Sequence, residues 1–300
     1  VLPLIIEAAA KSVAPEAAMT RSLGLLHAIA KRTSYLALLE EKPVALQRLV
    51  DVVARSAWLS ERLVEHPLLL DELLDHRVAQ AFPDRQQLSV LAKQALAIED
   101  TEQALTALNE MRQSLSFRIA QATLFQQQVA SQSAVQLAEL AEVILQSVFE
   151  LAQAEIQSQH GMIPDAGFAV IGYGSVGAKE LGFASDLDLV FLHNATASMM
   201  SNGNRPLDAQ RYFARLAQKI ISLMQTITPA GRLYEVDMRL RPDGAKGLLV
   251  SSLDSFEEYQ RERAWTWEHQ ALVRSRSLAG NVEVHDRFEK IRVTALQAHR

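Results

Sequence analysis

Glycines and aspartates stand close together in one segment of the chain, and their spacing indicates phosphate and metal chemistry. Residues 172–177 read Gly-Tyr-Gly-Ser-Val-Gly behind the apolar run 168–171, which is the spacing of a dinucleotide fingerprint. That fingerprint needs a crossover of about ten residues or more, with an acidic residue about twenty positions on. Only residues 178–185 separate the glycines from Asp186 and Asp188, which open the next strand. The spacing therefore favours a phosphate-cradling turn that leads into a carboxylate pair, the layout of a metal-dependent nucleotidyltransferase.

A later segment supplies a third carboxylate. Side chains along a strand alternate between its two faces, so Asp186 and Asp188 share one face while the leucines at 187 and 189 enter the core. Residues 233–241 have the same alternation and predict another strand, with four charged residues on its second face: Glu235, Asp237, Arg239 and Arg241. If this strand lies beside the first, Asp237 completes a cluster of three acids.

Three clustered carboxylates offer the oxygen-rich setting that Mg²⁺ prefers, especially where substrate phosphates add further ligands. Two such ions, about 3.5–4 Å apart, would clamp the attacking and leaving oxygens of an in-line displacement at phosphorus. Gly174 lets the backbone approach a phosphate closely, and Ser175 adds a hydroxyl donor. Arg239 and Arg241 would neutralise charge on the leaving group. The sequence therefore predicts a magnesium-dependent site for a nucleoside triphosphate.

Four segments carry a resemblance to a known enzyme family: residues 172–174, 180–193, 234–242 and 265–276. In these segments the chain resembles glutamine synthetase adenylyltransferase, also called the adenylyl-ligase/adenylyl-removing enzyme, of the polymerase beta-like nucleotidyltransferase superfamily. That enzyme contains two similar halves, one that adenylylates a tyrosine of glutamine synthetase and one that removes AMP by phosphorolysis. The sequence Trp-Glu-His-Gln-Ala-Leu-Val at 267–273 is more similar to the adenylylating C-terminal half.

The resemblance implies ATP-dependent adenylylation of glutamine synthetase, with Asp186 and Asp188 holding the metal ions and Asp237 as the third acid. It also implies a PII-type signal protein as a regulatory partner. Family members usually carry lysine where this chain has Ser175, so the phosphate contact of that lysine has no counterpart here. Since the chain carries one such catalytic unit, we expect a fragment of a larger bifunctional polypeptide, truncated at the C-terminal end of its catalytic domain.

Helical segments and a glycine-rich segment must position these residues. Residues 25–160 contain no glycine, and leucines and alanines recur there at helical spacing between the prolines. After residue 160 the glycines cluster and strand-like runs appear. We therefore predict an α+β chain: an all-helical domain over 1–158, then a nucleotidyltransferase domain over 159–300 with a small mixed sheet flanked by helices.

Within the second domain we predict strands over 168–171, 187–192 and 248–250, and a helix that Asp208 caps. A further helix is expected over 255–276. We interpret the tryptophans of that helix, Trp265 and Trp267, as packing anchors rather than a platform for a nucleobase. Its arginines are assigned to a solvated face, with contact to phosphate or to a protein substrate as the alternative: Arg263, Arg274 and Arg276.

Composition excludes several classes of protein. The chain has no cysteine, so disulfides and thiolate metal sites are excluded. No long uncharged apolar run is present, and we expect no membrane span. The formal net charge of -5 disfavours a nucleic acid as partner, because such a partner requires a basic surplus. We expect a cytoplasmic protein.

Two other functions fit the same residues. Phosphorolytic removal of AMP from adenylylated glutamine synthetase would use the same metals, and a regulatory module would bind nucleotide without turnover. A ligand-free connection would explain the glycine turn, taken alone, equally well. Pairing with Glu235 or with neighbouring acids would explain Arg239 and Arg241 nearly as well as contact with phosphate.

Overall fold

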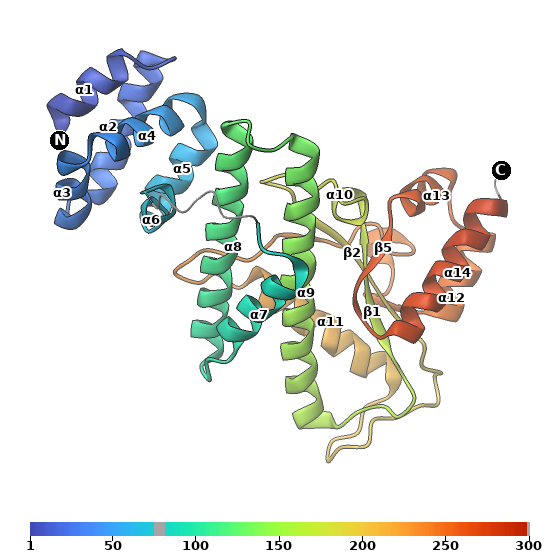
Figure 1. The fold of residues 1–300 in the computed structure, drawn as a ribbon. Coiled ribbons are helices and arrows are strands. Elements are labelled where there is room, and N and C mark those ends of the chain that lie inside the picture. Colours follow the sequence, from blue (N-terminus) through green and yellow to red (C-terminus); the bar gives the residue numbers. More distant parts are fainter. Residues whose placement is uncertain (75–81, 299–300) are drawn as a thin grey trace. The chain divides into compact units, whose positions relative to one another are not determined.

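The chain forms two compact units, seen in a computed structural model that describes residues 1–74 and 82–298 (Figure 1). Unit 1 contains Val1–Phe82 and Glu110–Ser133, and unit 2 contains Pro83–Asn109 and Ala134–Arg300. The two groups interleave along the chain, whereas the domain boundary predicted between 158 and 159 divides it into consecutive halves. That boundary stays a prediction about domains.

Unit 1 is built from helices. They are α1 (Leu2–Ala10), α2 (Pro15–Ile29), α3 (Thr33–Glu41), α4 (Pro43–Arg55), α5 (Ala57–Glu65), α6 (Leu69–Leu74) and residues 110–124 of α8 (Thr101–Leu124). Proline stands near the start of α1, α2 and α4, where its missing N–H has no helical partner to lose. The Ser56 side chain accepts a hydrogen bond from the N–H of Leu59 and caps α5.

Unit 2 begins with helices from the glycine-free part of the chain. These are α7 (Arg85–Leu96), residues 101–109 of α8, and residues 134–160 of α9 (Ala130–His160). A capping box between Asp84 and Gln87 opens α7. Aliphatic residues at helical spacing give α9 a buried stripe: Leu137, Leu140, Ile144 and Val148. The helical character predicted for the first half of the chain is confirmed.

A five-stranded mixed sheet forms the centre of unit 2. Its strands are β1 (Phe168–Tyr173), β2 (Leu187–His193), β3 (Val236–Asp237), β4 (Val250–Ser252) and β5 (Arg276–Gly280). The order is β3-β2-β1-β5, with β4 also paired to β2. β1 runs antiparallel to β2 and β5, while β3 and β4 run parallel to β2. The small mixed sheet with flanking helices confirms the predicted α+β class.

Helices cover both faces of this sheet. On one face, Ala169, Ile171 and Tyr173 of β1 belong to a core cluster with residues of α12 (Leu253–Glu262), α13 (Thr266–Val273) and α14 (Val282–Ala298). On the other face the Phe168 ring stacks with rings from α9 and α11 (Ala209–Gln225). Every residue of β1 is therefore buried, so the glycine turn that follows this strand starts from a rigid base.

Two sequence predictions about secondary structure were wrong. The strand expected over 233–241 is reduced to the two residues of β3, because the chain then folds into a turn with the short 3-10 helix η2 (Gly244–Lys246). The helix expected over 255–276 is α12 and α13 followed by β5. A new helix starts after Trp265 because the Glu268 carboxylate accepts the N–H of Trp265 at 2.8 Å.

Other local predictions were correct. β1 and β2 contain the strands expected over 168–171 and 187–192. The Asp208 carboxylate accepts the N–H of Arg211 at 2.9 Å and caps α11. Among residues 1–74 and 82–298, none of the helices combines the length and the apolar character that a membrane crossing requires.

Candidate active site

The glycine turn lies directly after β1, as the one-turn helix α10 (Gly174–Gly177). Gly174 has φ +59°, in the left-handed region that side chains rarely adopt. A Cβ atom at Gly174 would lie 2.5 Å from Oδ2 of Asp188, so the backbone of the turn packs against this carboxylate. A Cβ atom at Gly177 would collide with the carbonyl oxygen of Arg274. The two glycines permit close packing on both sides of the turn.

The first two acids stand at the start of β2. Asp186 is exposed and precedes the strand, while Asp188 is half-buried within it. Leu187 and Leu189 are fully buried in the core. The alternation predicted from the sequence is confirmed, and it sends both carboxylates to one side of the strand.

The electrostatics of Asp188 reflect a crowded acidic site. Burial raises the pKa of its carboxyl group, and the negative charges of Asp186 and Asp237 raise it further. Arg239 and Arg274 act in the opposite direction without cancelling this effect. The three predicted acids are therefore close enough to repel one another.

Asp237 reaches the same place from β3, where it is the register partner of Asp188. Its carboxylate accepts hydrogen bonds from the Arg239 backbone N–H at 2.8 Å and from Arg239 Nε at 2.7 Å. Arg239 Nη2 also forms an ion pair with it. Hydrogen bonding from the Arg239 side chain is the main cause that holds the pKa of Asp237 below its usual range. The third acid thus already has a cationic partner.

The sequence suggested that Arg241 contacts a phosphate, but in the structure this side chain binds backbone carbonyls. Its guanidinium donates to three backbone carbonyls of the turn that follows β3: those of Met238 at 2.8 Å, Ala245 at 3.0 Å and Gly247 at 3.3 Å. These bonds hold the turn together. A role for Arg241 in nucleotide binding stays a prediction, as does the role of the half-buried Ser175 in the glycine turn.

The carboxylates provide part of the ligand set that a divalent cation requires. Asp186 and Asp188 offer oxygen ligands whose repulsion a cation would relieve. Each oxygen of Asp237 already accepts a hydrogen bond from Arg239, which leaves fewer lone pairs for a cation. Over the described ranges, no three His, Cys, Asp or Glu side chains form a group that could hold a metal ion. The donor chemistry of Asp186 and Asp188 fits a divalent cation, and the ligand set of three acids stays a prediction.

Arg276 is a site residue that sequence reasoning missed. It had been assigned to a solvated helix face, but it starts β5, in register with Gly172 of β1. Its guanidinium donates to the carbonyls of Val176 at 3.1 Å and Gly177 at 3.2 Å. Residues 277–280, Ser-Leu-Ala-Gly, contain no β-branched or aromatic residue, so the sequence carries no strong strand signal that would have found it.

Trp265 and Trp267 are not packing anchors, which corrects the interpretation made from the sequence. They are 70% and 54% exposed. The buried face of α13 is formed instead by Glu268, His269 and Leu272. Glu268 accepts hydrogen bonds from both the Tyr259 hydroxyl and the Trp265 N–H, which fixes the helix start and leaves the indoles outside.

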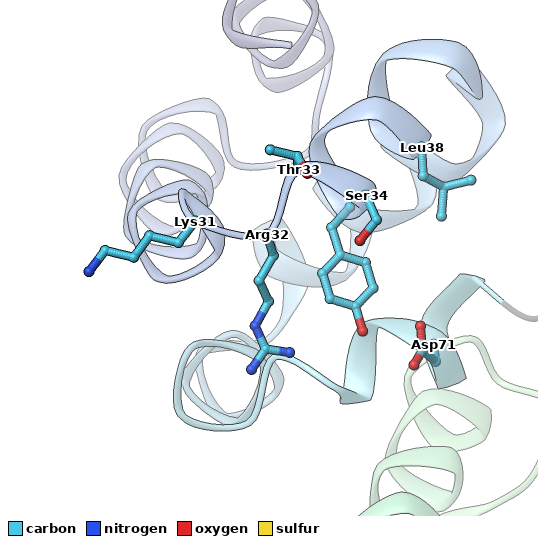
Figure 2. A pocket seen from close by; sticks show the side chains of 7 residues that line it. Lys31, Arg32, Thr33, Ser34, Leu38 and Asp71 are labelled. Carbon is cyan, nitrogen blue, oxygen red and sulfur yellow. The ribbon is translucent and has the colours of Figure 1, made fainter.

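Unit 1 has a hollow of about 710 Å³, remote in sequence from the acids (Figure 2). It is lined by Lys31, Arg32, Thr33, Ser34, Tyr35, Leu38 and Asp71. Figure 2 shows the Lys31 side chain extending away from Asp71. Burial, together with the charge of Asp71, raises the pKa of Tyr35. The lining contains none of the predicted site residues, so the candidate active site stays with the acids of unit 2.

A glycine turn packed on one of two neighbouring aspartates, beside a third aspartate on the next strand of a mixed sheet, is the arrangement of a nucleotidyltransferase domain. Residues 46–291 match the family model described as glutamate-ammonia ligase adenylyltransferase. The chain belongs to this family.

Similar proteins support the same family. The chain is 56% identical over 301 residues to a bifunctional glutamine synthetase adenylyltransferase/adenylyl-removing enzyme of Stenotrophomonas maltophilia, covering 100% of the chain and 32% of that protein. A protein of the same description from Xanthomonas axonopodis pv. citri is 56% identical over 97% of the chain and 31% of its own length. One from Thioalkalivibrio sulfidiphilus is 43% identical over 97% of the chain and 31% of its own length. The chain spans about a third of the length of these curated relatives.

Proposed function

We propose that this chain carries an adenylyltransferase site, which transfers AMP from ATP to a tyrosine of glutamine synthetase. The observation that carries the proposal is the contact between the glycine turn and Asp188, with Asp186 and Asp237 beside it. A phosphate bound at the turn would lie next to the acids. The family and the descriptions of the relatives, which name adenylyl transfer and glutamine synthetase, support this choice of transferred group and protein substrate.

In the proposed reaction, the tyrosine oxygen attacks the α-phosphorus of ATP. A bond forms between this oxygen and phosphorus, the bond to the bridging oxygen breaks, and pyrophosphate leaves on the opposite side. Asp237 is proposed to accept the proton of the tyrosine hydroxyl. The carboxylate of Asp237 is ionised at neutral pH, which is the form that accepts a proton, and departure of Arg239, whose hydrogen bonding lowers the pKa of Asp237, would make it a stronger base.

Other residues of the chain would orient and screen the nucleotide. Gly174 and Ser175 are proposed to approach the triphosphate through backbone and hydroxyl groups. Arg239, which is exposed beside the acids, is proposed to move from Asp237 to the departing pyrophosphate. Mg²⁺ held by Asp186 and Asp188 would supply charge neutralisation at phosphorus when it is bound. A second Mg²⁺ ion is part of the proposal only if Asp237 also serves as a metal ligand.

The double substitution Asp186→Asn plus Asp188→Asn tests this proposal. We expect it to abolish the transfer of labelled AMP from ATP to glutamine synthetase while the protein stays folded, because asparagine keeps the shape of each side chain and removes its charge. Matched controls are Asp208→Asn and Asp254→Asn, which change exposed or partly exposed carboxylates on other elements. Unchanged transfer in the double variant would refute the assignment.

A second activity is proposed because the relatives are described as bifunctional and adenylyl-removing. The same acids would then carry AMP from adenylylated tyrosine to phosphate, forming ADP. Incubation with unmodified glutamine synthetase and ATP, or with the adenylylated form and phosphate, separates the two directions. Release of pyrophosphate in the first mixture would also exclude a module that only binds nucleotide.

The remaining assignments rest on family resemblance and belong to the same proposal. They are a PII-type signal protein as regulatory partner and a cytoplasmic location. A pull-down of the intact protein with a PII-type protein, in the presence and absence of ATP, tests the first of them.

A further inference from the structure

A series of charged contacts connects α9 to the glycine turn. Nη2 of Arg276 donates to Oε1 of Glu142 at 2.5 Å and to the Val176 carbonyl at 3.1 Å. Nε of the same side chain donates to the Gly177 carbonyl at 3.2 Å. One guanidinium therefore joins a carboxylate on α9 to two carbonyls at the C-terminal end of the turn, one of which, that of Val176, also accepts the Lys179 N–H at 3.3 Å.

Glu142 is buried to a degree that is unusual for a carboxylate. Its side chain is 1% exposed, and its second oxygen accepts a hydrogen bond from Arg85 at 2.6 Å. Burial raises the pKa of Glu142, but the hydrogen bonds and charges of Arg276 and Arg85 outweigh burial and hold the pKa below its usual range. A carboxylate this buried is stable only with such partners, so the two arginines hold the Glu142 carboxylate in its ionised form and in its position.

A second contact reaches the turn from the same helix. Glu139 lies one helical turn before Glu142 and forms an ion pair with Lys179 at 3.2 Å. On the far side of the turn, Glu180 accepts a hydrogen bond from Arg274 at 2.5 Å. The turn and the residues that follow it are thus held from α9 and from the segment between α13 and β5.

We propose that Glu142 and Arg276 are positioning residues for AMP transfer, which hold the glycine turn against Asp188. The argument rests on the proposed function, since it assigns a role around the same site. Neither side chain needs to touch the nucleotide. A turn released from Arg276 would shift its Gly174 end relative to the Asp188 carboxylate, with which it is in contact. Displacements of about 1 Å at reacting groups cost up to about 100-fold in rate.

Substitutions at Arg276 test the proposal in the intact protein. Arg276→Gln removes the ion pair and the fork of donors, and we expect the KM for ATP to rise at least about tenfold with the KM for glutamine synthetase unchanged. Arg276→Lys keeps the charge beside Glu142 and should recover part of the loss. Lys219→Gln is the matched control, because it removes a charge that pairs with α9 at Glu155, at 2.6 Å, and leaves both arginine contacts of Glu142 in place. It should leave both KM values unchanged.

Calorimetry with MgATP and thermal unfolding complete the test. We expect Arg276→Gln to weaken MgATP binding by the same factor as the KM, at temperatures well below its unfolding midpoint. An equal rise in the KM for ATP in Lys219→Gln would overturn the proposal, as would a lower unfolding midpoint in Arg276→Gln with unchanged ATP binding. If the unsubstituted protein binds MgATP but transfers no AMP, the proposed function fails while the binding measurements still decide the role of Arg276.

Discussion

Replacement of Gly174 by alanine tests how closely the glycine turn and the carboxylate of Asp188 are coupled. The new methyl group has two separate effects. It forces a residue with a side chain to adopt φ +59°, and it places a carbon atom 2.5 Å from Oδ2 of Asp188. An ordinary contact begins at 3.4 Å, so the carboxylate must retreat by about 0.9 Å, the difference between these two distances.

Each effect has its own expected magnitude. The left-handed backbone costs about 1–2 kcal/mol of stability in an L-residue. The displaced carboxylate should lower the rate of AMP transfer by about 100-fold, since a misplacement near 1 Å costs about this much. Gly244→Ala separates the two effects, because Gly244 has φ +55° and the nearest atom to a new Cβ there, the Arg239 carbonyl oxygen, lies at 3.7 Å.

The assay is the initial rate of AMP transfer to glutamine synthetase, measured beside urea unfolding of the same preparations. We expect both variants to lose similar stability and only Gly174→Ala to lose most of its activity. Similar activity losses in the two variants would refute the reasoning, and so would a Gly174→Ala protein that transfers AMP at the normal rate.

Three further predictions concern unit 2. His193 is buried and stacks on Phe213 with ring centroids 4.8 Å apart, and burial lowers its pKa from 6.5 to about 4. Because the unfolded chain takes up a proton below pH 6.5 and the folded chain does not, stability should fall by about 2 kcal/mol between pH 7 and pH 5, and urea unfolding of His193→Gln should lack this loss. Trp265→Ala and Trp267→Ala should each change the free energy of unfolding by less than about 1 kcal/mol, whereas Phe256→Ala, in the core, should cost about 3–5 kcal/mol. Asp188→Asn removes a carboxylate whose pKa burial and neighbouring acids raise, so thermal unfolding should show a higher midpoint at pH 7 together with lost transfer.

The sequence was sufficient to predict the parts of the fold that depend on short-range patterns. Helical spacing without glycine predicted the long helices, and alternation around Leu187 and Leu189 predicted which aspartates leave the core. The glycine turn followed by two acids predicted that these groups lie together, as the packing of Gly174 on Asp188 confirms, while their role as an active site stays a prediction. These features depend on neighbours along the chain, which a single sequence displays.

The parts that could not be predicted depend on contacts between distant residues. Arg276 donates to a carboxylate that lies 134 positions earlier in the chain, and no local pattern indicates that pairing. The alternation at 233–241 predicted a full strand, but Arg241 finds better partners in the carbonyls of its own turn. Trp265 and Trp267 belong to a residue type that is usually buried, yet the core beneath α13 is filled by other side chains.

The two short strands β3 and β4 both lie along β2, and this has a consequence for how the family can diversify. Val236 is opposite Leu187, and Val250 is opposite Phe191. The segment 238–249 therefore begins and ends beside the same strand, at two positions about 13 Å apart along β2. Insertions or exchanges between these fixed ends alter no strand register. A lineage that keeps Arg239 and Arg241 can therefore change the rest of the segment beside the third acid without redesigning the sheet that carries the aspartates.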